Sequence, residues 1–263
     1  MKIVIDSTLD VSDDLRKFVT VVPLNVEIAG HRFKDEKPLE EVFEIMRKSK
    51  SFAKTSQPSP KDFERAYSEL LKEEDWILSI HISSKLSGTY NSARIASEKF
   101  KGKVFVFDSM SASIAGHILV KEALKLSNEN PERVLRELKI ARDSTKFYLT
   151  VDNLEFLKRS GRLKGVESIV SSILKLRPLI EVVEGALKTK KVHRGNAKVL
   201  KDMKKLMENA KEVIIGHVLN PQVANELKEH ADSLGIPSEI IAVRSCALSV
   251  HLGPKAYGIA LRM

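Results

Sequence analysis

Two hydroxyl-rich stretches contain the residues of this sequence that are best suited to bind an anion. KTSQPSP, residues 54–60, carries three hydroxyl side chains and an amide, and ISSKLSGTYNSA, residues 82–93, places Ser87 and Gly88 before a helix-like segment. A helix start directs backbone N–H groups and the positive end of the helix dipole toward a ligand, and Gly88 allows close approach. Such donors can hold an anionic group that would be costly to bury without a partner.

Helix capping is the structural alternative for both stretches. Ser59 followed by Pro60 is typical of the first residues of a helix, so these two residues account for the helix start that follows. Thr55 and Ser56 are then left without a capping role. Ser87 is different, because capping its own helix explains it at least as well as ligand binding does.

Standard catalytic motifs do not occur in this sequence. Lys85 stands where a G-x-S-x-G elbow around Ser87 needs its first glycine, and neither G-x-x-x-x-G-K-[ST] nor G-x-G-x-x-G is present. The seven histidines show no metal-ligand spacing, so we expect neither a metal nor a bound cofactor. A serine-dependent acyl hydrolase or transferase stays open, with Ser87 as nucleophile and His251 as base.

Composition indicates a globular protein of one large or two modest domains. The 263 residues are 43% hydrophobic and 30% charged, and the one cysteine, Cys246, suits a reducing compartment. The N-terminal run is too short for a signal peptide, and no stretch approaches the roughly 18 apolar residues of a membrane span. We therefore expect a cytoplasmic protein.

The formal charge of +9 does not by itself indicate nucleic-acid binding. Lysines and arginines are interspersed with acids, as in LLKEEDWILS, and only 6% of the residues are aromatic. This pattern is typical of solvated helix faces and offers few rings on which bases could stack. We expect no nucleic-acid partner, while contact with a membrane surface, an acidic partner or solubility alone remain open roles for the charge.

Strands and helices alternate in the first half of the chain, which predicts a mostly parallel sheet with helices on both faces. Ligands of such sheets gather beyond the carboxyl ends of the strands. The predicted strands lie at 2–5, 76–83 and 103–109, an extended or hairpin segment at 19–33, and helices at 13–18, 38–49, 60–74, 89–100 and 112–127. The polar residues at these strand ends are Asp6, Ser7, Ser83, Ser84, Ser87, Asp108 and Ser109.

The pattern changes near residue 146, where we expect a second α/β domain with a mixed six-stranded sheet. The domains are thus predicted at 1–146 and 147–263. The expected strands are 147–152, 177–183, 186–194, 212–218, 238–243 and 257–262, with a short hairpin connection at EGA, residues 184–186. Helices are expected at 154–160, 166–176, 196–210 and 221–235.

Four further polar residues have ordinary structural explanations. Arg159 and Arg162 flank Gly161, which predicts a helix closed by a left-handed cap with cations at its negative end. Arg194 follows a strand and can pair with a carboxylate or with water. His251 precedes a Gly-Pro turn, and a lone histidine there is more often structural than functional.

The ordered set of these fragments resembles the DegV family of bacterial lipid-binding proteins. DSTLD, KTSQPSP, ISSKLSGTYNSA, VFVFDS, LEFLKRSGRL and VHLGPKAYGIAL occur in this order over residues 2–262. Two departures concern local turns: the family usually has two glycines where Ser160 and Gly161 stand, and another glycine in place of Lys255.

The resemblance implies a two-domain protein that binds one long-chain fatty acid between its domains and does not catalyse a reaction itself. In the family, the carboxylate is held by the threonine of T-S-Q-P-S and the serine of S-G-T-Y, which are Thr55 and Ser87 here, next to Gly88. The residues that match the family's head-group histidine and arginine are His251 and Arg194. Some members present the carboxylate to a separate fatty acid kinase, and peripheral membrane contact is compatible with that role.

Overall fold

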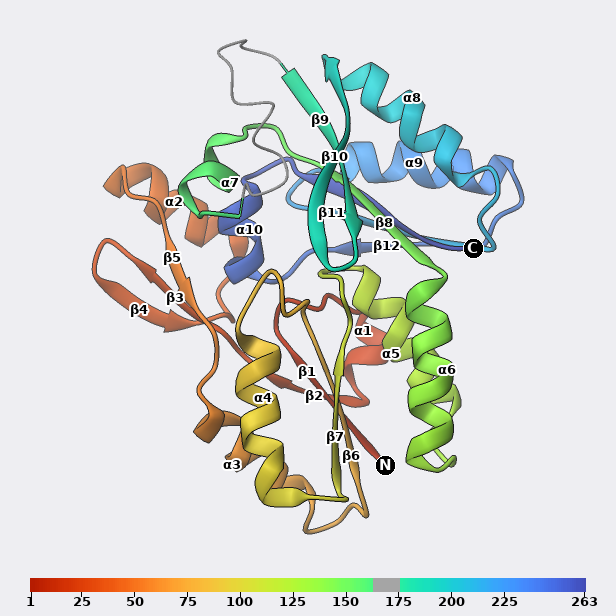
Figure 1. The fold of residues 1–263 in the computed structure, drawn as a ribbon. Coiled ribbons are helices and arrows are strands. Elements are labelled where there is room, and N and C mark those ends of the chain that lie inside the picture. The colour runs from red at the N-terminus through yellow and green to blue at the C-terminus, as the bar shows by residue number, and fades with distance from the viewer. Residues whose placement is uncertain (163–175) are drawn as a thin grey trace.

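The computed structural model describes residues 1–162 and 176–263 and arranges them around two large sheets, one above the other in Figure 1. The lower sheet has four parallel strands in the order β2-β1-β6-β7. Its strands are β1 (Lys2–Asp6), β2 (Val19–Val22), β6 (Ile77–His81) and β7 (Val104–Asp108). β1, β6 and β7 lie at the predicted strands, whereas β2 is the start of the segment that was predicted only as extended chain or hairpin.

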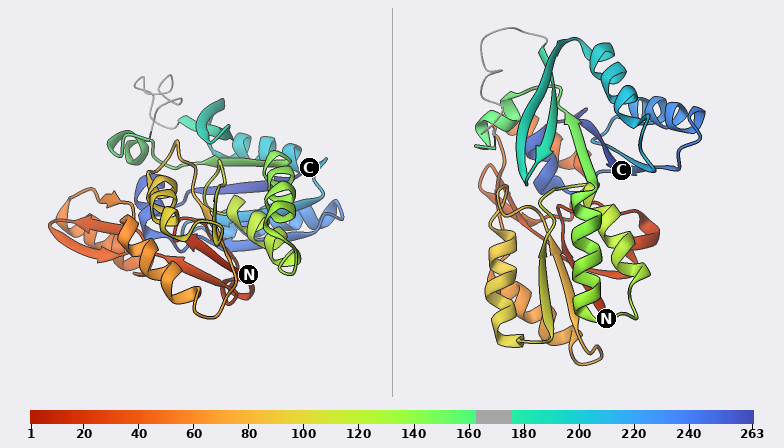
Figure 2. Two further views of the ribbon diagram at one scale, coloured as in Figure 1. Left: turned by 60° about the horizontal axis from the view of Figure 1, so that its bottom comes forward. Right: turned by 45° about the vertical axis from the view of Figure 1, so that its right-hand side comes forward.

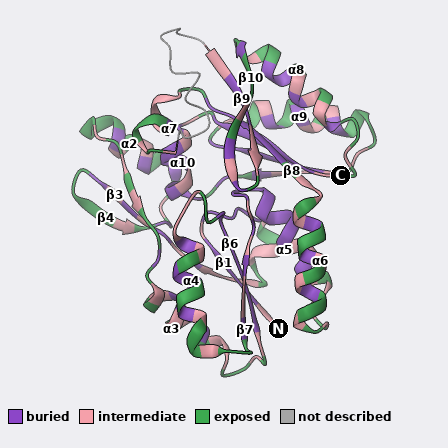
Figure 3. Cartoon of the chain, viewed as in Figure 1, coloured by how far each residue is buried: buried purple, intermediate pink, exposed green. Residues whose placement is uncertain are grey.

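Helices cover both faces of the lower sheet, which confirms the predicted three-layer arrangement. One face packs against α3 (Pro60–Leu70) and α4 (Thr89–Ser97), and the other against α5 (Ala115–Lys125) and α6 (Pro131–Asp143). Because both faces are covered, β6 is buried along its whole length, as its purple colour in Figure 3 shows. Ser59 caps α3 through a capping box with Asp62, as its position before Pro60 indicated.

A small antiparallel sheet flanks the lower sheet and carries the KTSQPSP stretch. The segment predicted as extended chain or hairpin forms β3 (Asn25–Ile28) and β4 (His31–Lys34), joined by Ala29 and Gly30 at positive φ. The third strand, β5 (Lys54–Ser56), pairs with β3 and sets Thr55 opposite Val26. Three polar residues show no apolar alternation, so this strand was not expected from the sequence.

The upper sheet has six strands of mixed direction, as predicted, and the structure gives their order as β10-β9-β8-β13-β11-β12. Only β11 and β12 pair in parallel; the other neighbours are antiparallel. One face is covered by α8 (Asn196–Met207) and α9 (Pro221–Ser233). The strands are β8 (Thr145–Thr150), β9 (Leu176–Val183), β10 (Ala186–Arg194), β11 (Glu212–His217), β12 (Ser238–Ala242) and β13 (Tyr257–Arg262).

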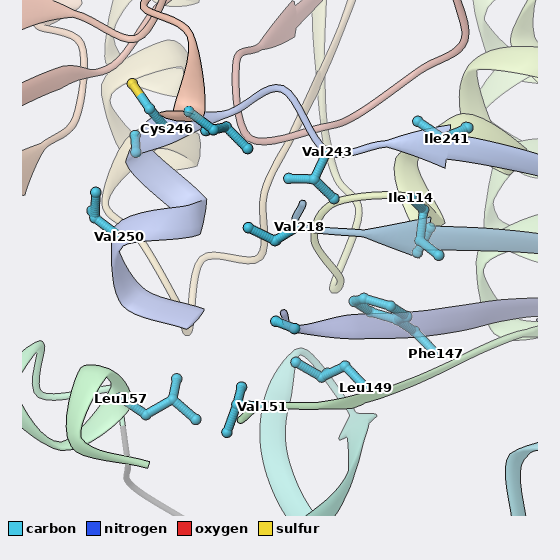
Figure 4. Close-up of a cluster of buried hydrophobic side chains, with 14 of the residues drawn as sticks. Ile114, Phe147, Leu149, Val151, Leu157, Val218, Ile241, Val243, Cys246 and Val250 are labelled. Atoms are coloured by element: carbon cyan, nitrogen blue, oxygen red, sulfur yellow. The ribbon is translucent and has the colours of Figure 1, made fainter. Parts of the chain in front are cut away.

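The other face of the upper sheet packs onto the lower part of the molecule through a shared apolar cluster. This cluster unites α2 (Leu39–Ser49), the start of α5 and α10 (Cys246–Leu252) with the sheet, and Figure 4 shows Ile114, Phe147 and Cys246 within it. Burial raises the pKa of the Cys246 thiol, so this cysteine is an inert part of the core. The proposed domain boundary between residues 146 and 147 falls within β8.

Two helices were missed by the sequence patterns, and one predicted helix remains outside the described residues. α6 begins with Asn130 as cap and Pro131 at its first position, a signal that was overlooked. α10 is short and buried on most sides, so it shows no amphipathic period. The helix predicted at 166–176 lies outside the described residues except for Leu176, which belongs to β9.

Candidate functional site

A cavity of about 240 Å³ lies between the two large sheets, with walls from strands of the upper sheet and from the loops beyond the strands of the lower one. Its apolar lining comes mainly from leucine, isoleucine and phenylalanine side chains, whereas its polar lining includes the KTSQPSP stretch, the Ser87 loop and α10. The apolar lining includes Leu24, Ile82, Phe147, Leu149, Val182 and Leu187. The polar lining includes Thr55, Gln57, Ser87, Arg162 and His251. A cavity with this division suits a molecule that has a long apolar part and a polar end.

Thr55 and His251 meet at the polar part of this cavity. The Thr55 hydroxyl lies 2.7 Å from Nε2 of His251, which joins β5 to α10 across 196 residues of sequence. Burial, and next the charge of Arg162, lower the pKa of His251 to about 3. Its Nδ1 has no hydrogen-bond partner among residues 1–162 and 176–263. His251 is therefore a neutral ring that fixes Thr55.

Ser87 lines the same cavity and stands one residue before the N-cap of α4. The N-cap residue is Gly88, and the Ser87 hydroxyl lies 2.9 Å from the Thr89 hydroxyl while accepting the Thr89 backbone N–H at 3.3 Å. Ser87 thus supports the start of α4 from the position before the N-cap, which leaves both the helix-start role and a ligand contact open to its hydroxyl. A hydroxyl shared with Thr89 can turn its proton toward a ligand, because Thr89 can donate in its place.

Gly88 is favoured by a neighbouring side chain rather than by its backbone conformation. Its φ of −74° is open to any residue, but a Cβ here would lie 2.2 Å from Oε1 of Gln57. Gln57 also donates from Nε2 to the Ser92 hydroxyl at 3.2 Å, and thereby joins the Thr55 segment to α4. Gln57 was not predicted as a site residue, although it stands two residues after Thr55.

Two arginines near the ends of their elements, Arg162 and Arg194, differ in their distance from the cavity: Arg162 lines it and Arg194 does not. Arg162 lines the cavity just beyond α7 (Glu155–Arg159) and Gly161, whose φ of +72° gives the left-handed turn expected there. Its Nη1 donates to the Ser160 carbonyl at 2.6 Å. Arg194 is exposed at the far end of β10, opposite Leu176, and is not part of the cavity wall. The structure therefore brings together Thr55, Ser87, Gly88 and His251, but not Arg194.

The aspartates at the strand ends organise loops and do not face the cavity. Asp6 accepts hydrogen bonds from the backbone N–H of Thr8 and Ile82, at 3.0 and 2.9 Å. Asp108 accepts the backbone N–H of Met110 at 2.8 Å. These carboxylates replace the missing backbone partners of the turns, which holds the loops beyond the strands in place.

An Asp-His-Ser arrangement occurs in the lower sheet but is inaccessible. His81 lies between Asp6, 3.1 Å from Nδ1, and the Ser79 hydroxyl, 2.7 Å from Nε2, and Tyr67 completes the chain at 2.8 Å from Ser79. All four residues are fully buried within the sheet and α3. No substrate can reach this serine in the closed fold, so the network is structural.

Two buried carboxylates, Asp10 and Asp35, fix the start of α10 and hence the position of His251. Asp10 accepts the backbone N–H of Arg244 at 2.9 Å and the Ser113 hydroxyl at 2.8 Å. Asp35 accepts the Ser245 hydroxyl at 2.7 Å and the Ala247 N–H at 2.9 Å. Burial raises the pKa of Asp10 to about 6 despite these donors.

Within the described ranges, no group of three or more His, Cys, Asp or Glu side chains is placed to hold a metal ion. None of the helices in those same ranges combines the length and apolar character needed to cross a membrane.

Comparison with known proteins relates the whole chain to one family. A family model described as "Uncharacterised protein, DegV family" matches residues 1–263. A Thermotoga maritima relative named a fatty acid-binding protein is 31% identical over 282 residues, which cover 100% of this chain and 98% of the relative.

Solved structures agree with this match. The structure described as fatty acid binding of a DegV family protein from Thermus thermophilus has a TM-score of 0.91 at 34% identity and covers 100% of this chain and 99% of that one. A structure from Bacillus subtilis, described as DegV, a fatty acid binding protein, has a TM-score of 0.88 at 25% identity, with 98% and 97% covered.

Proposed function

This chain belongs to the DegV family, as its sequence fragments indicated, and on that basis we propose that it binds one long-chain fatty acid in the cavity between its two domains. The proposed domains are 1–146 and 147–263. The observation that carries the proposal is the cavity itself, whose wall is mainly apolar and whose polar part holds Thr55 against His251.

The tail of the ligand supplies most of the affinity. Each buried methylene contributes roughly 0.8 kcal/mol, so a full acyl chain contributes on the order of 10 kcal/mol before the cost of ordering is subtracted. Phe147, Leu149, Val182 and Leu187 from the upper sheet and Leu24 from the lower unit form the surface that accepts this tail.

The head group needs hydrogen-bond donors, because an unpaired buried carboxylate costs several kcal/mol. Thr55 and Ser87 supply hydroxyl donors, with Gly88 beside them. A neutral His251 either accepts the Thr55 proton or donates to its oxygen, and so keeps the hydroxyl in place. We assign the cationic contribution to Arg162, which lines the cavity, in place of Arg194.

We propose that the chain is a carrier without catalysis of its own. Ser87 has Thr89 as its hydrogen-bond partner, and His251 is paired with Thr55, so these two cavity-lining residues are not assembled as a nucleophile and base. This pairing favours the carrier over the serine hydrolase or transferase. Turnover of acyl esters that Ser87→Ala abolishes would reverse the choice.

Presentation of the carboxylate to a separate fatty acid kinase is the second part of the proposal, and it rests on the family resemblance. Such a kinase uses ATP, so we place the carrier in the cytoplasm. The test mixes the fatty-acid-loaded protein with a cognate kinase and ATP and measures acyl phosphate. Formation of acyl phosphate only when this protein is present supports the proposal, and its absence with every candidate kinase contradicts it.

A basic surface over β10 and α8 supports peripheral contact with an anionic membrane. Residues 188–205 contain eight lysines and arginines but one acid, Asp202. Five of the cations have no carboxylate within ion-pair distance in the described part of the chain: Lys188, Arg194, Lys198, Lys201 and Lys205. Sedimentation with phosphatidylglycerol vesicles, but not with phosphatidylcholine vesicles, is the expected result, and it weakens as salt is added.

A further inference from the structure

The turn of the β9–β10 hairpin contacts the loop that carries Ser87. Ser83 donates from its hydroxyl to the Gly185 carbonyl at 2.7 Å, although the two residues are 102 positions apart. Figure 2 shows this hairpin extending from the upper sheet toward the loops above the lower one. Ser83 is 1% exposed, so this hydrogen bond is shielded from water and its loss leaves a buried carbonyl without a partner.

On the lower side, Ser83 organises the head-group loop. Its backbone N–H donates to the Ser111 carbonyl at 2.8 Å, and its carbonyl accepts the N–H of Leu86 at 2.9 Å and of Ser87 at 3.0 Å. The turn that presents the Ser87 hydroxyl to the cavity therefore begins at Ser83. A shift of Ser83 moves Ser87 with it.

On the upper side, the hairpin turn presents Gly185 to Ser83. Glu184 and Gly185 have φ of +50° and +81°, the combination of a tight two-residue hairpin turn. A Cβ on Gly185 would lie 2.3 Å from the Ser83 hydroxyl oxygen, so the contact is close enough to require glycine. Val182 and Leu187 on either side of the turn line the apolar cavity.

We infer that Ser83 is a positioning residue that locks the hairpin wall of the tail cavity onto the head-group loop. This inference rests on the proposed function, because it names the group that keeps both ends of a bound fatty acid enclosed. Removal of the hydroxyl frees the hairpin and loosens the Ser87 loop together. Release of the lipid then becomes faster whatever its head group is.

The first test compares Ser83→Ala with Ser84→Ala, an exposed neighbour whose side chain is outside the cavity wall. Dissociation rates are measured for a long-chain fatty acid and for the fatty alcohol of equal length. Ser83→Ala is expected to accelerate release of both ligands by about fivefold or more, whereas Ser84→Ala leaves both rates unchanged. Thr55→Ala, in contrast, affects the acid more than the alcohol.

The second test uses Gly185→Ala, alone and combined with Ser83→Ala. In the single variant, the new methyl group meets the Ser83 oxygen, and release becomes faster. In the double variant that oxygen is absent, so Gly185→Ala adds less to the release rate of the Ser83→Ala variant than to that of the wild type. Hydrogen exchange of residues 181–187 in the folded variants should rise in parallel with the release rate.

The outcomes separate this inference from the proposed function. A wild-type protein that retains neither ligand contradicts the proposed function. Retention by the wild type together with unchanged release from Ser83→Ala, or with strictly additive effects of the two substitutions, overturns the role of Ser83 and leaves the proposed function intact.

Discussion

The Thr55 hydroxyl and Nε2 of His251 lie 2.7 Å apart, so one hydrogen bond connects β5 with α10. β5 belongs to the part of the chain that forms the lower sheet (the lower unit), and α10 follows β12 in the part that forms the upper sheet (the upper unit). The start of α10 is itself held by Asp10 and Asp35 of the lower unit. The head-group end of the proposed site is thus assembled from both units, and its geometry depends on how they pack.

Arg162, and not Arg194, is expected to contribute to carboxylate binding. Arg162→Gln should weaken fatty acid binding about tenfold, because the charge-assisted interaction with the head group is lost. Arg194→Gln is the matched control and should leave the affinity unchanged, since Arg194 is exposed and away from the cavity. Titration calorimetry with the same fatty acid measures both; an equal loss in the two variants would refute the assignment.

His251 is expected to stay neutral in the ligand-free protein at ordinary pH. Its pKa of about 3 lies below the unfolded value of 6.5, so the folded state binds fewer protons in this interval. The contribution of His251 to stability is therefore complete above pH 6.5 and is lost as the pH falls toward 3. NMR of the ring nitrogens, with His251→Gln for assignment, should show no protonation between pH 5 and 8; a midpoint near 6.5 would contradict the burial argument.

The contribution of Asp10 to the free energy of unfolding should be lost as the pH rises from about 4 through 6. Burial raises its pKa from 3.8 to about 6, so the folded state holds the proton more tightly than the unfolded state. This contribution is full below pH 3.8 and disappears above 6, a change on the order of 3 kcal/mol. Urea unfolding of the wild type and Asp10→Asn at several pH values measures it.

The exposed Asp14→Asn variant is the control for Asp10→Asn. The difference in unfolding free energy between wild type and Asp10→Asn should fall between pH 4 and 7, whereas the difference for Asp14→Asn should change much less. A pH-independent difference for Asp10→Asn would show that its carboxyl group does not retain a proton in the folded state.

Gly88→Ala and Gln57→Ala are expected to weaken fatty acid binding through the same contact. A methyl group on Gly88 occupies the place of the Gln57 amide, whose flexible end can move aside, and this motion breaks its bond to Ser92. Each variant should reduce affinity a few-fold, about the effect of one partly buried hydrogen bond. In the double variant the effects should not add. Additive losses would mean that Gly88 acts on the ligand directly.

The fold was largely predictable because its strands and helices carry strong hydrophobic patterns. β6 and β7 are continuous apolar runs, and the six strands of the upper sheet are each bounded by turn residues. β5 and α10 were not predictable, since β5 has three residues without apolar alternation and α10 is surrounded by core. Both missed elements hold residues of the candidate site.

Most of the predicted site residues line the cavity, but their pairings were not predictable. Elimination of a capping role singled out Thr55, the helix start indicated Ser87 and Gly88, and the family resemblance assigned Thr55, Ser87 and His251 to the head group. The contact between Thr55 and His251 depends on the packing of two units, which no local pattern encodes. Arg194 was matched from its place after the hairpin, whereas the arginine beside the cavity is Arg162, whose position after α7 indicated only a helix end.

The most direct test is mass spectrometry of lipid extracted from the purified protein, together with fatty acid titration of the delipidated protein and of its Thr55→Ala, Ser87→Ala double variant. We expect one long-chain fatty acid per wild-type chain and a loss of about tenfold or more in affinity in the double variant. A wild-type protein that neither carries nor binds a fatty acid, or a double variant with full affinity, would contradict the account.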